Sequence, residues 1–312
     1  MVSVIIPTLN AGKQIGLLLE KLRSQTMPCE ILVLDSSSDD ATVSIARSYN
    51  AGTIVINRDD FDHGGSRTMA GKTAQGDIVA YLTQDALPAD TEMLQRLIRP
   101  FADAATGAVY GRQLPAPDAT PFAAHLRLFN YPASSCMKNL SDKQTYGIKT
   151  PFLSNSCAAY RRSALEAIGW FRDGMILGED TSAGADLLRA GYTLAYAADA
   201  TVHHSHNYTA AEEFRRYFDI GVFHAREAWL LEEFGGAGGE GAAYVMSAAS
   251  HLLAGRRYLL LPELMLRSGL KLIGYDLGRI YKRLPLSLIR KMSMHPSWWE
   301  KNAGKGKGKL KT

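Results

Sequence analysis

Asp85 is a carboxylate just beyond an apolar run, residues 77–83, where a charged side chain has little reason to stand without a partner. The apolar run predicts a strand, so Asp85 lies at its carboxyl end. Mg²⁺ and Mn²⁺ prefer oxygen ligands and complete their shells with water and phosphate oxygens, so one aspartate can suffice. We therefore predict a divalent-cation site at Asp85, where the metal would offset charge growing on a nucleotide diphosphate leaving group.

Three histidines, His203, His204 and His206, follow a second predicted strand, residues 192–202. Alternation along a strand places His204 and His206 on one face and His203 on the other. One of them could complete the metal site, and we assign His206 to it. A two-histidine zinc centre is the alternative, but no third ligand shows the usual spacing and the acidic residues suit a harder ion.

Glu179 and Asp180 are adjacent acids before a helix-like stretch, residues 182–190. Neighbouring side chains point in different directions, so each can have its own role. We assign Asp180 as a general base, which takes the proton from an acceptor hydroxyl while that oxygen attacks an anomeric carbon and a diphosphate departs from the opposite side. Such a single displacement inverts the anomeric centre. The alternative is that both acids only favour the dipole of a helix N-terminus, worth ~0.3 to 1 kcal/mol.

Two further strand ends carry groups that could read a pyrimidine. The runs 2–8 and 30–35 predict strands, and their ends supply Thr8, Asn10 and Asp35. A carboxylate such as Asp35 can accept the N3 hydrogen of uracil or thymine, while Thr8 and Asn10 support base and ribose. Serine side chains in the second loop could instead cap the helix that follows, and both roles can coexist.

Residues 61–67 form a glycine-containing loop that leads into a predicted helix, so its backbone amides together with Arg67 could hold a diphosphate. A plain turn is the alternative. The residues predicted to bind a nucleotide sugar are Pro7, Thr8, Asn10, Asp35, Ser37, His63, Gly64, Arg67, Gln84 and Asp85. Further groups that could contact an acceptor or a phosphate are Arg112, Glu179, Arg215, Arg216 and His224.

These residues need elements that bring them together. Strands alternate with helix-like stretches through the first third of the chain, which predicts an α/β fold with a mainly parallel central sheet. In such sheets ligands bind beyond the carboxyl ends of the strands, where the connecting loops converge. With 312 residues, 46% of them hydrophobic, the chain can bury a large core and holds one large domain or one with an appendage.

The second half of the chain suggests separate regions. Five glycines within 235–241 oppose regular structure and predict a linker. Apolar residues repeat at helical spacing through 266–284 with basic residues mostly opposite, which predicts C-terminal amphipathic helices. We therefore expect a catalytic domain at 1–234, a Gly-rich linker at 235–241, a helical membrane-associating or oligomerising region at 242–300 and a disordered basic tail at 301–312.

The charge is uneven along the chain. Residues 255–312 hold 14 Lys and Arg against 3 Asp and Glu, a net +11 that leaves −7 for the rest. Anionic headgroups attract such segments, so the amphipathic helices could lie on a membrane; packing on the catalytic domain or on a second subunit is the alternative. We recognise no signal peptide in the sequence, and no apolar run approaches the ~20 residues of a membrane-spanning helix. The three cysteines lack the spacing of a metal site or a disulfide framework, which favours a reducing compartment.

Several motifs taken together resemble those of family 2 glycosyltransferases, and more narrowly those of bacterial O-antigen rhamnosyltransferases. They are Val4–Asn10 (VIIPTLN), Phe61–Arg67 (FDHGGSR), Leu82–Ala86 (LTQDA), Tyr110–Pro115 (YGRQLP), Phe129–Pro132 (FNYP), Glu179–Asp180 and His204–Thr209 (HSHNYT). The similarity is strong over 2–241 and looser beyond. It implies a GT-A fold, a dTDP-β-L-rhamnose donor, a divalent cation and an undecaprenyl-diphosphate-linked sugar acceptor.

The resemblance also implies roles for single residues. Asp85 matches the final acid of the family's Asp-x-Asp metal motif, whose first acid is replaced here by Thr83, and Asp180 matches the catalytic base. The implied place of action is the cytoplasmic face of a bacterial inner membrane. The protein could form a homo-oligomer, and we expect no nucleic-acid partner. Another nucleotide-sugar donor is the nearest alternative; a nucleotidyltransferase or a non-catalytic nucleotide-sugar sensor is more distant.

Overall fold

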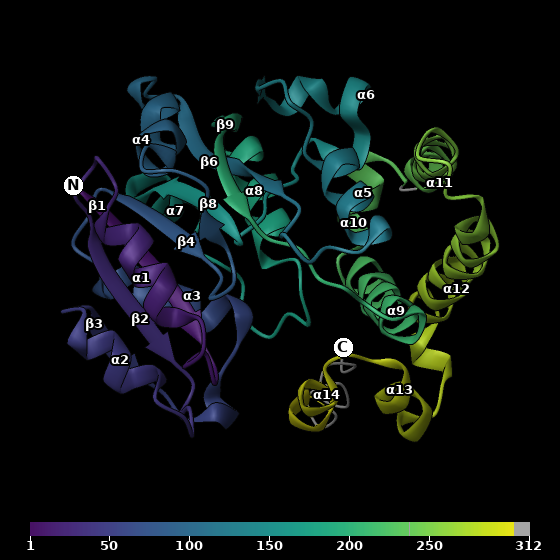
Figure 1. The fold of residues 1–312 in the computed structure, drawn as a ribbon, viewed down its shortest axis with the longest axis horizontal. Helices are drawn as coiled ribbons and strands as arrows, with labels where there is room; N and C mark the ends of the chain where they lie inside the picture. Colours follow the sequence, from purple (N-terminus) through teal and green to yellow (C-terminus); the bar gives the residue numbers. More distant parts are fainter. Residues whose placement is uncertain (237, 303–312) are drawn as a thin grey trace, which may run out of the picture. The chain divides into compact units, whose positions relative to one another are not determined.

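The computed structural model describes residues 1–236 and 238–302 of the chain (Figure 1). The chain divides into two compact units. The first joins Met1–Asp173 with Glu179–His206, and the second joins the short segment Gly174–Gly178 with the chain from Asn207 onward. The first unit contains the β-sheet, and the described part of the second is built of helices.

One mixed sheet organises the first unit, with the strand order β3-β2-β1-β4-β8-β6-β9-β5 and β7 paired to β9. The strands are β1 Val2–Thr8, β2 Glu30–Asp35, β3 Gly52–Val55, β4 Ile78–Leu82, β5 Leu87–Pro88, β6 Thr106–Leu114, β7 Cys136–Lys138, β8 Cys157–Arg161 and β9 Thr193–His203. Strands β3, β2, β1 and β4 run parallel, as do β6 and β9, which confirms the predicted α/β architecture. Strands β8, β5 and β7 run antiparallel to their neighbours.

Helices cover the sheet in the first unit and make up the second. In the first unit they are α1 Ile15–Arg23, α2 Thr42–Ser48, α3 His63–Thr73, α4 Met93–Ile98, α5 Pro121–Asn130, α6 Lys143–Tyr146, α7 Arg162–Ala167 and α8 Glu179–Arg189. In the second they are α9 Ala210–Arg226, α10 Ala228–Phe234, α11 Gly238–Ala254, α12 Leu261–Arg279, α13 Leu286–Met292 and α14 Pro296–Asn302. The predicted C-terminal helices are thus present. None of the helices within the described residues is long and apolar enough to cross a bilayer.

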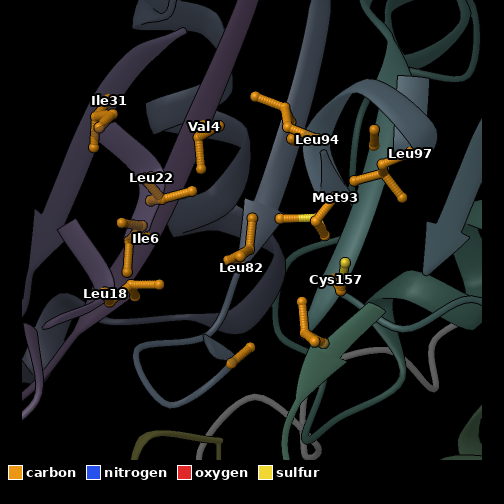
Figure 2. Close-up of a cluster of buried hydrophobic side chains, with 14 of the residues drawn as sticks. Val4, Ile6, Leu18, Leu22, Ile31, Leu82, Met93, Leu94, Leu97 and Cys157 are labelled. Atoms are coloured by element: carbon orange, nitrogen blue, oxygen red, sulfur yellow. The ribbon is translucent and has the colours of Figure 1, made fainter. Parts of the chain in front are cut away.

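The contact between α1 and β1 shows how the sequence builds the core of the first unit. Leu18 and Leu22 stand four residues apart and therefore share one face of α1. Val4 and Ile6 stand two residues apart and so point to the same side of β1. All four side chains are buried in one cluster (Figure 2). Each buried leucine contributes roughly 1.5–3 kcal/mol relative to an exposed one.

Glycine allows α9 and α12 to pack at close range in the second unit. A Cβ on Gly278 would lie 2.1 Å from the backbone oxygen of Phe218, so no other residue type fits without movement. The same contact buries Lys271, whose Nζ lies 3.2 Å from a carboxylate oxygen of Glu213. A buried lysine needs such a partner because its charge loses hydration.

The apolar stripe predicted within 266–284 is only partly used for packing: Tyr281 is buried and Leu277 is half-buried, but other members are exposed. Leu266 is 59% exposed and Ile273 is 52% exposed. The buried positions of α12 are Leu264, Lys271, Gly274 and Gly278. Small residues pack here because they let the two backbones approach, and this leaves several larger apolar side chains on the outside.

The structure also differs from the predicted organisation at the Gly-rich segment. Helix α11 begins at Gly238, so the second half of 235–241 is helical rather than an irregular linker. The two compact units divide after His206, ahead of the predicted boundary at 234, because α9 packs with α12. Of the predicted tail 301–312, residues 303–312 lie outside the described residues.

We predict that Gly278→Ala destabilises the second unit by about 1–3 kcal/mol, because the added methyl overlaps the Phe218 carbonyl. Gly269→Ala is the matched control in the same helix, since a Cβ there would meet nothing within 4 Å. That substitution should be neutral or stabilising by up to ~1 kcal/mol, the difference in helix propensity. Urea unfolding followed by circular dichroism checks both, and equal stability of the two variants would contradict the packing argument.

Candidate active site

Four strands bring the predicted residues to one edge of the sheet. Strand β4 ends at Leu82, which pairs with Cys157 at the start of antiparallel β8, so the residues after β4 and before β8 leave the sheet together. Strand β8 is also antiparallel to β6, so β4 and β6 end at the same edge. Leu114 at the end of β6 pairs with His203 at the end of parallel β9. The loops after β4, β6 and β9 therefore converge.

Asp85, His204 and His206 form a cluster at this edge. Their potential ligand atoms all lie within 4.8 Å of one another. Nε2 of His204 is 3.4 Å from one carboxylate oxygen of Asp85, and Nδ1 of His206 is 3.8 Å from the other. The sequence predicts Asp85 and His206 as metal ligands, and the structure adds His204. Strand alternation, which places both histidines on one face, is the signal that could have identified it.

The carboxyl of Asp85 is held in its ionised form. Burial raises its pKa, but hydrogen bonding and charge from His204, a hydrogen bond from Thr83 and the charge of His206 together outweigh burial. The net result is a pKa well below the ordinary value of an aspartate. An ionised carboxylate beside two imidazoles is a suitable donor set for a divalent transition-metal ion.

The types of ligand atom in this cluster indicate which metal ions it could bind. Two imidazole nitrogens are better ligands for Mn²⁺ or Zn²⁺ than for Mg²⁺, which prefers oxygen. The sequence argument against zinc was that a third ligand was missing, and the structure places Asp85 beside both histidines. The ligand count therefore no longer separates zinc from manganese.

The two adjacent acids, Glu179 and Asp180, are the first residues of helix α8. Glu179 is buried, and its carboxylate lies 3.3 Å from Nη1 of buried Arg67. The Asn155 side-chain amide also donates to Glu179 at 3.1 Å, and Tyr160 donates its hydroxyl proton to the Asn155 carbonyl oxygen at 2.8 Å. Burial raises the pKa of Glu179, but the charges of Arg67 and His63 and the hydrogen bonds to the carboxylate together outweigh burial, so the pKa is lowered overall.

Asp180 lies next to Glu179 and has the opposite electrostatic setting. Its carboxylate accepts hydrogen bonds from the backbone amides of Asn155 at 3.1 Å and Thr181 at 2.7 Å. Burial and then the neighbouring negative charge of Glu179 raise its pKa to about 6, even though these hydrogen bonds favour the ionised form. A carboxylate with a raised pKa is a better proton acceptor near neutral pH than an ordinary aspartate.

The two centres are joined by a short bonded path. His204 contacts the side-chain oxygen of Gln113 through Nδ1 at 2.9 Å, and the Gln113 amide donates to the Ser154 hydroxyl at 2.9 Å. Ser154 is followed directly by Asn155, whose backbone amide binds Asp180. The segment before β8 thus connects the cluster around Asp85 to the carboxylate of Asp180.

The predicted pyrimidine-reading loops are tied to each other. Asp35 is fully buried, and its carboxylate accepts hydrogen bonds from the Thr8 hydroxyl at 2.9 Å and from the backbone and side chain of Ser38 at 2.8 and 2.6 Å. The side-chain oxygen of Asn10 accepts from the backbone amide of Asp39 at 2.9 Å. Neither Ser37 nor Ser38 caps α2, which shows no side-chain cap. Asp35 therefore braces the loops, whatever else it contacts.

Other predicted nucleotide-sugar residues follow the same pattern of internal pairing. The Gln84 side-chain oxygen accepts from the backbone amide of Leu9 at 2.9 Å. The Ser37 hydroxyl donates to the backbone oxygen of Ile56 at 2.8 Å. Pro7 lies in the last part of β1 and is half-buried. These contacts fix the backbone conformation of the loops at this edge of the sheet. Binding of a nucleotide sugar by these residues stays a prediction.

The predicted phosphate-binding helix end already has partners. The Asp62 side chain accepts from the backbone amides of Gly64 at 3.1 Å and Gly65 at 2.7 Å, which caps α3. A Cβ on Gly64 would lie 1.8 Å from the backbone oxygen of Arg172, so close packing explains this glycine. Arg67 points inward, donating to the His63 backbone oxygen at 2.9 Å besides pairing with Glu179. These groups thus have structural partners, and their contact with a diphosphate stays a prediction.

The remaining predicted contacts are spread over both units. Arg112 donates through Nε to the backbone oxygen of Tyr131 at 3.1 Å in the first unit. Arg215, Arg216 and His224 belong to α9 in the second unit, so the structure does not place them in the cluster. Burial, helped by the charge of Arg279, lowers the pKa of His224 to about 4, so this imidazole is neutral near pH 7 and a poor phosphate ligand.

Comparison with known proteins gives a family and close relatives. The family model described as Glycosyl transferase family 2 matches residues 3–169. The chain is 45% identical over 301 residues to the O-antigen chain rhamnosyltransferase RfbN of Salmonella typhimurium, covering 96% of each chain. It is 44% identical over 300 residues to the O-antigen chain rhamnosyltransferase WbaN of Salmonella anatum, covering 95% of each.

Solved structures share the fold at low identity. A mannosyltransferase from Pyrobaculum calidifontis, solved in complex with GDP-Man and Mn²⁺, aligns with a TM-score of 0.61 at 20% identity, over 91% of this chain and 88% of that one. Residues 1–349 of TarS from S. aureus, solved in complex with UDP, align with a TM-score of 0.54 at 17% identity, over 90% and 91%. These similarities confirm the predicted GT-A fold.

We predict that Glu179→Gln lowers the pKa of Asp180 toward its ordinary value. The substitution removes the negative charge that contributes to the raised pKa, while glutamine can still accept the Asn155 hydrogen bond. The remaining rise comes from burial. Carboxyl ¹³C NMR titration of aspartate-labelled protein, with the signal assigned by Asp180→Asn, measures the shift. An unchanged pKa in the variant would mean that Glu179 does not act on Asp180.

Proposed function

Because the chain belongs to glycosyltransferase family 2, we propose that it transfers L-rhamnose from dTDP-β-L-rhamnose to an undecaprenyl-diphosphate-linked sugar during O-antigen synthesis. The observation that carries the choice of rhamnose is the 45% identity to a relative named an O-antigen chain rhamnosyltransferase, across 96% of both chains. Family membership also decides for a glycosyltransferase over the nucleotidyltransferase alternative.

Asp180 is the proposed general base. Its raised pKa of about 6 leaves it mostly ionised at neutral pH, yet basic enough to take a proton from an acceptor hydroxyl. The backbone amides of Asn155 and Thr181 orient the carboxylate. Attack of the acceptor oxygen on the anomeric carbon, with the diphosphate leaving from the opposite side, makes the proposed reaction inverting.

The cluster of Asp85, His204 and His206 is the proposed binding site of a divalent cation, Mn²⁺ or Mg²⁺. A bound cation would offset the negative charge that grows on the departing nucleotide diphosphate. The two imidazoles favour Mn²⁺ of this pair. The loops that hold Thr8, Asn10 and Asp35 are proposed to contact the nucleoside at the same edge of the sheet.

The proposed membrane contact lies in the second unit. Leu259 is 94% exposed in the turn between α11 and α12, and exposed Arg256 and Arg257 stand beside it. Met246 on α11 and Met265 on α12 are 72% and 63% exposed. A group of exposed large apolar side chains next to cationic ones fits a surface of anionic lipids, where the lipid-linked acceptor would be found.

We predict that the protein supplied with Mn²⁺, a lipid extract containing the acceptor and a panel of nucleotide sugars modifies the lipid only with dTDP-β-L-rhamnose. Mass analysis of the lipid product identifies the donor. The rate should fall as the pH drops through about 6, because the base becomes protonated. Thorough chelation should also stop transfer.

Asp180→Asn is the control for the same assay, because the amide keeps the shape of the side chain but cannot accept the proton. It should reduce transfer by about 100-fold or more while donor binding persists. Transfer from a different nucleotide sugar would refute the donor assignment. Undiminished turnover by the variant would remove Asp180 from its role.

We predict that Leu259→Ser weakens binding to vesicles containing anionic lipid by about 10-fold, which matches roughly 1.5 kcal/mol for one leucine side chain. Binding of the unchanged protein should weaken with added salt. Leu17→Ser is the matched control, since this leucine is exposed on α1 of the first unit. Vesicle sedimentation measures both. Equal binding of the two variants, or a Leu259-dependent dimer in sedimentation velocity, would contradict the membrane proposal.

A further inference from the structure

Gln113 contacts the metal-site histidine rather than the metal site itself. Its side chain is 1% exposed at the end of β6, and its oxygen lies 2.9 Å from Nδ1 of His204. The other ring nitrogen of His204, Nε2, faces Asp85 at 3.4 Å. One imidazole therefore bridges a buried amide on one side and a carboxylate on the other.

The orientation of the Gln113 amide is fixed by its other contacts. Nη1 of Arg127 donates to the same oxygen, and arginine can only donate. The amide nitrogen donates to the Ser154 hydroxyl at 2.9 Å. Reversing the amide would place its NH₂ group against the Arg127 guanidinium, where neither partner can accept. The oxygen therefore faces His204.

An amide oxygen is only an acceptor, so the atom of His204 that contacts it must carry a proton. In a neutral ring a proton on Nδ1 leaves a lone pair on Nε2. A cation shared with the carboxylate of Asp85 would bind that lone pair. Without the cation, Nε2 can instead be protonated and face the carboxylate as a donor.

We infer that Gln113, oriented by Arg127, is a positioning residue that holds His204 in the Nδ1–H tautomer and thereby keeps Nε2 available to bind the cation. This inference rests on the proposed metal site, and it adds residues that touch neither the metal nor the sugar. Without the amide oxygen, the proton of a neutral His204 would move to Nε2 and hydrogen-bond to Asp85. A metal ion would then have to displace that proton.

The test measures the tautomer and the metal affinity separately. Long-range ¹H–¹⁵N NMR of the imidazoles at pH 8, where an ordinary imidazole is neutral, reports which nitrogen of His204 carries the proton. His204→Gln assigns the signal among the eight histidines. Nδ1 of His204 should carry a proton in the unchanged metal-free protein, whether or not Nε2 is also protonated, and Gln113→Leu should shift the ring toward the form protonated on Nε2 alone. Electron paramagnetic resonance of free Mn²⁺ should show a 10- to 100-fold loss of affinity in Gln113→Leu.

Two further variants separate positioning from general damage. Gln113→Glu keeps an acceptor at this position and should retain the Nδ1–H tautomer and Mn²⁺ affinity within a few-fold. Gln25→Leu removes another buried glutamine of the first unit, whose side-chain partners are the backbone groups of Lys21, Asp90 and Leu94, and should change neither property.

The outcomes distinguish this inference from the proposed function. An unprotonated Nδ1 of His204 in the unchanged protein, or an Nδ1 protonation and an Mn²⁺ affinity that do not respond to Gln113→Leu, would overturn the inference. If the unchanged protein bound no Mn²⁺ while its tautomer followed Gln113 as expected, the positioning role would stand and the proposed metal site would fail.

Discussion

The candidate site depends on a short segment, Ser154 and Asn155, that lies directly before β8 and holds two acidic centres at one edge of the sheet. The Ser154 hydroxyl accepts from Gln113, which in turn contacts His204 beside Asp85. The backbone amide of Asn155 donates to Asp180. Because β8 runs antiparallel between β4 and β6, this segment emerges where both of those strands end.

This arrangement separates the protonation behaviour of the two aspartates. Asp85 has cationic or hydrogen-bonding partners that outweigh its burial, so its pKa is lowered, whereas burial and the charge of Glu179 raise the pKa of Asp180 to about 6. Two carboxylates in one site can thus take different roles, one as a permanently ionised ligand and the other as a proton acceptor. Arg67 forms a buried ion pair with Glu179. Without this partner, the carboxylate of Glu179 would be a buried unpaired charge, which is costly in free energy.

In the second unit, the way α12 packs on α9 determines which side chains of α12 remain exposed. Glycine positions and Lys271 form the face of α12 that packs on α9, so large apolar side chains such as Leu266 remain outside. A helix that leaves part of its apolar stripe exposed has a surface suited to another apolar or amphipathic partner. The exposed Leu259 and its neighbouring arginines extend this surface into the turn before α12.

The sequence by itself determined the alternation of strands and helices, the placement of Asp85 and Asp180 at element ends, and the family, because these depend on local patterns and contiguous motifs. It could not determine that β8 runs antiparallel, that Arg67 turns inward to Glu179, or that His204 joins Asp85 with Gln113 behind it. Those features need contacts between residues far apart in the chain. Only the tertiary structure decided them, because a side chain's partner depends on which strands pair and on how closely helices approach, and neither is encoded within a single segment.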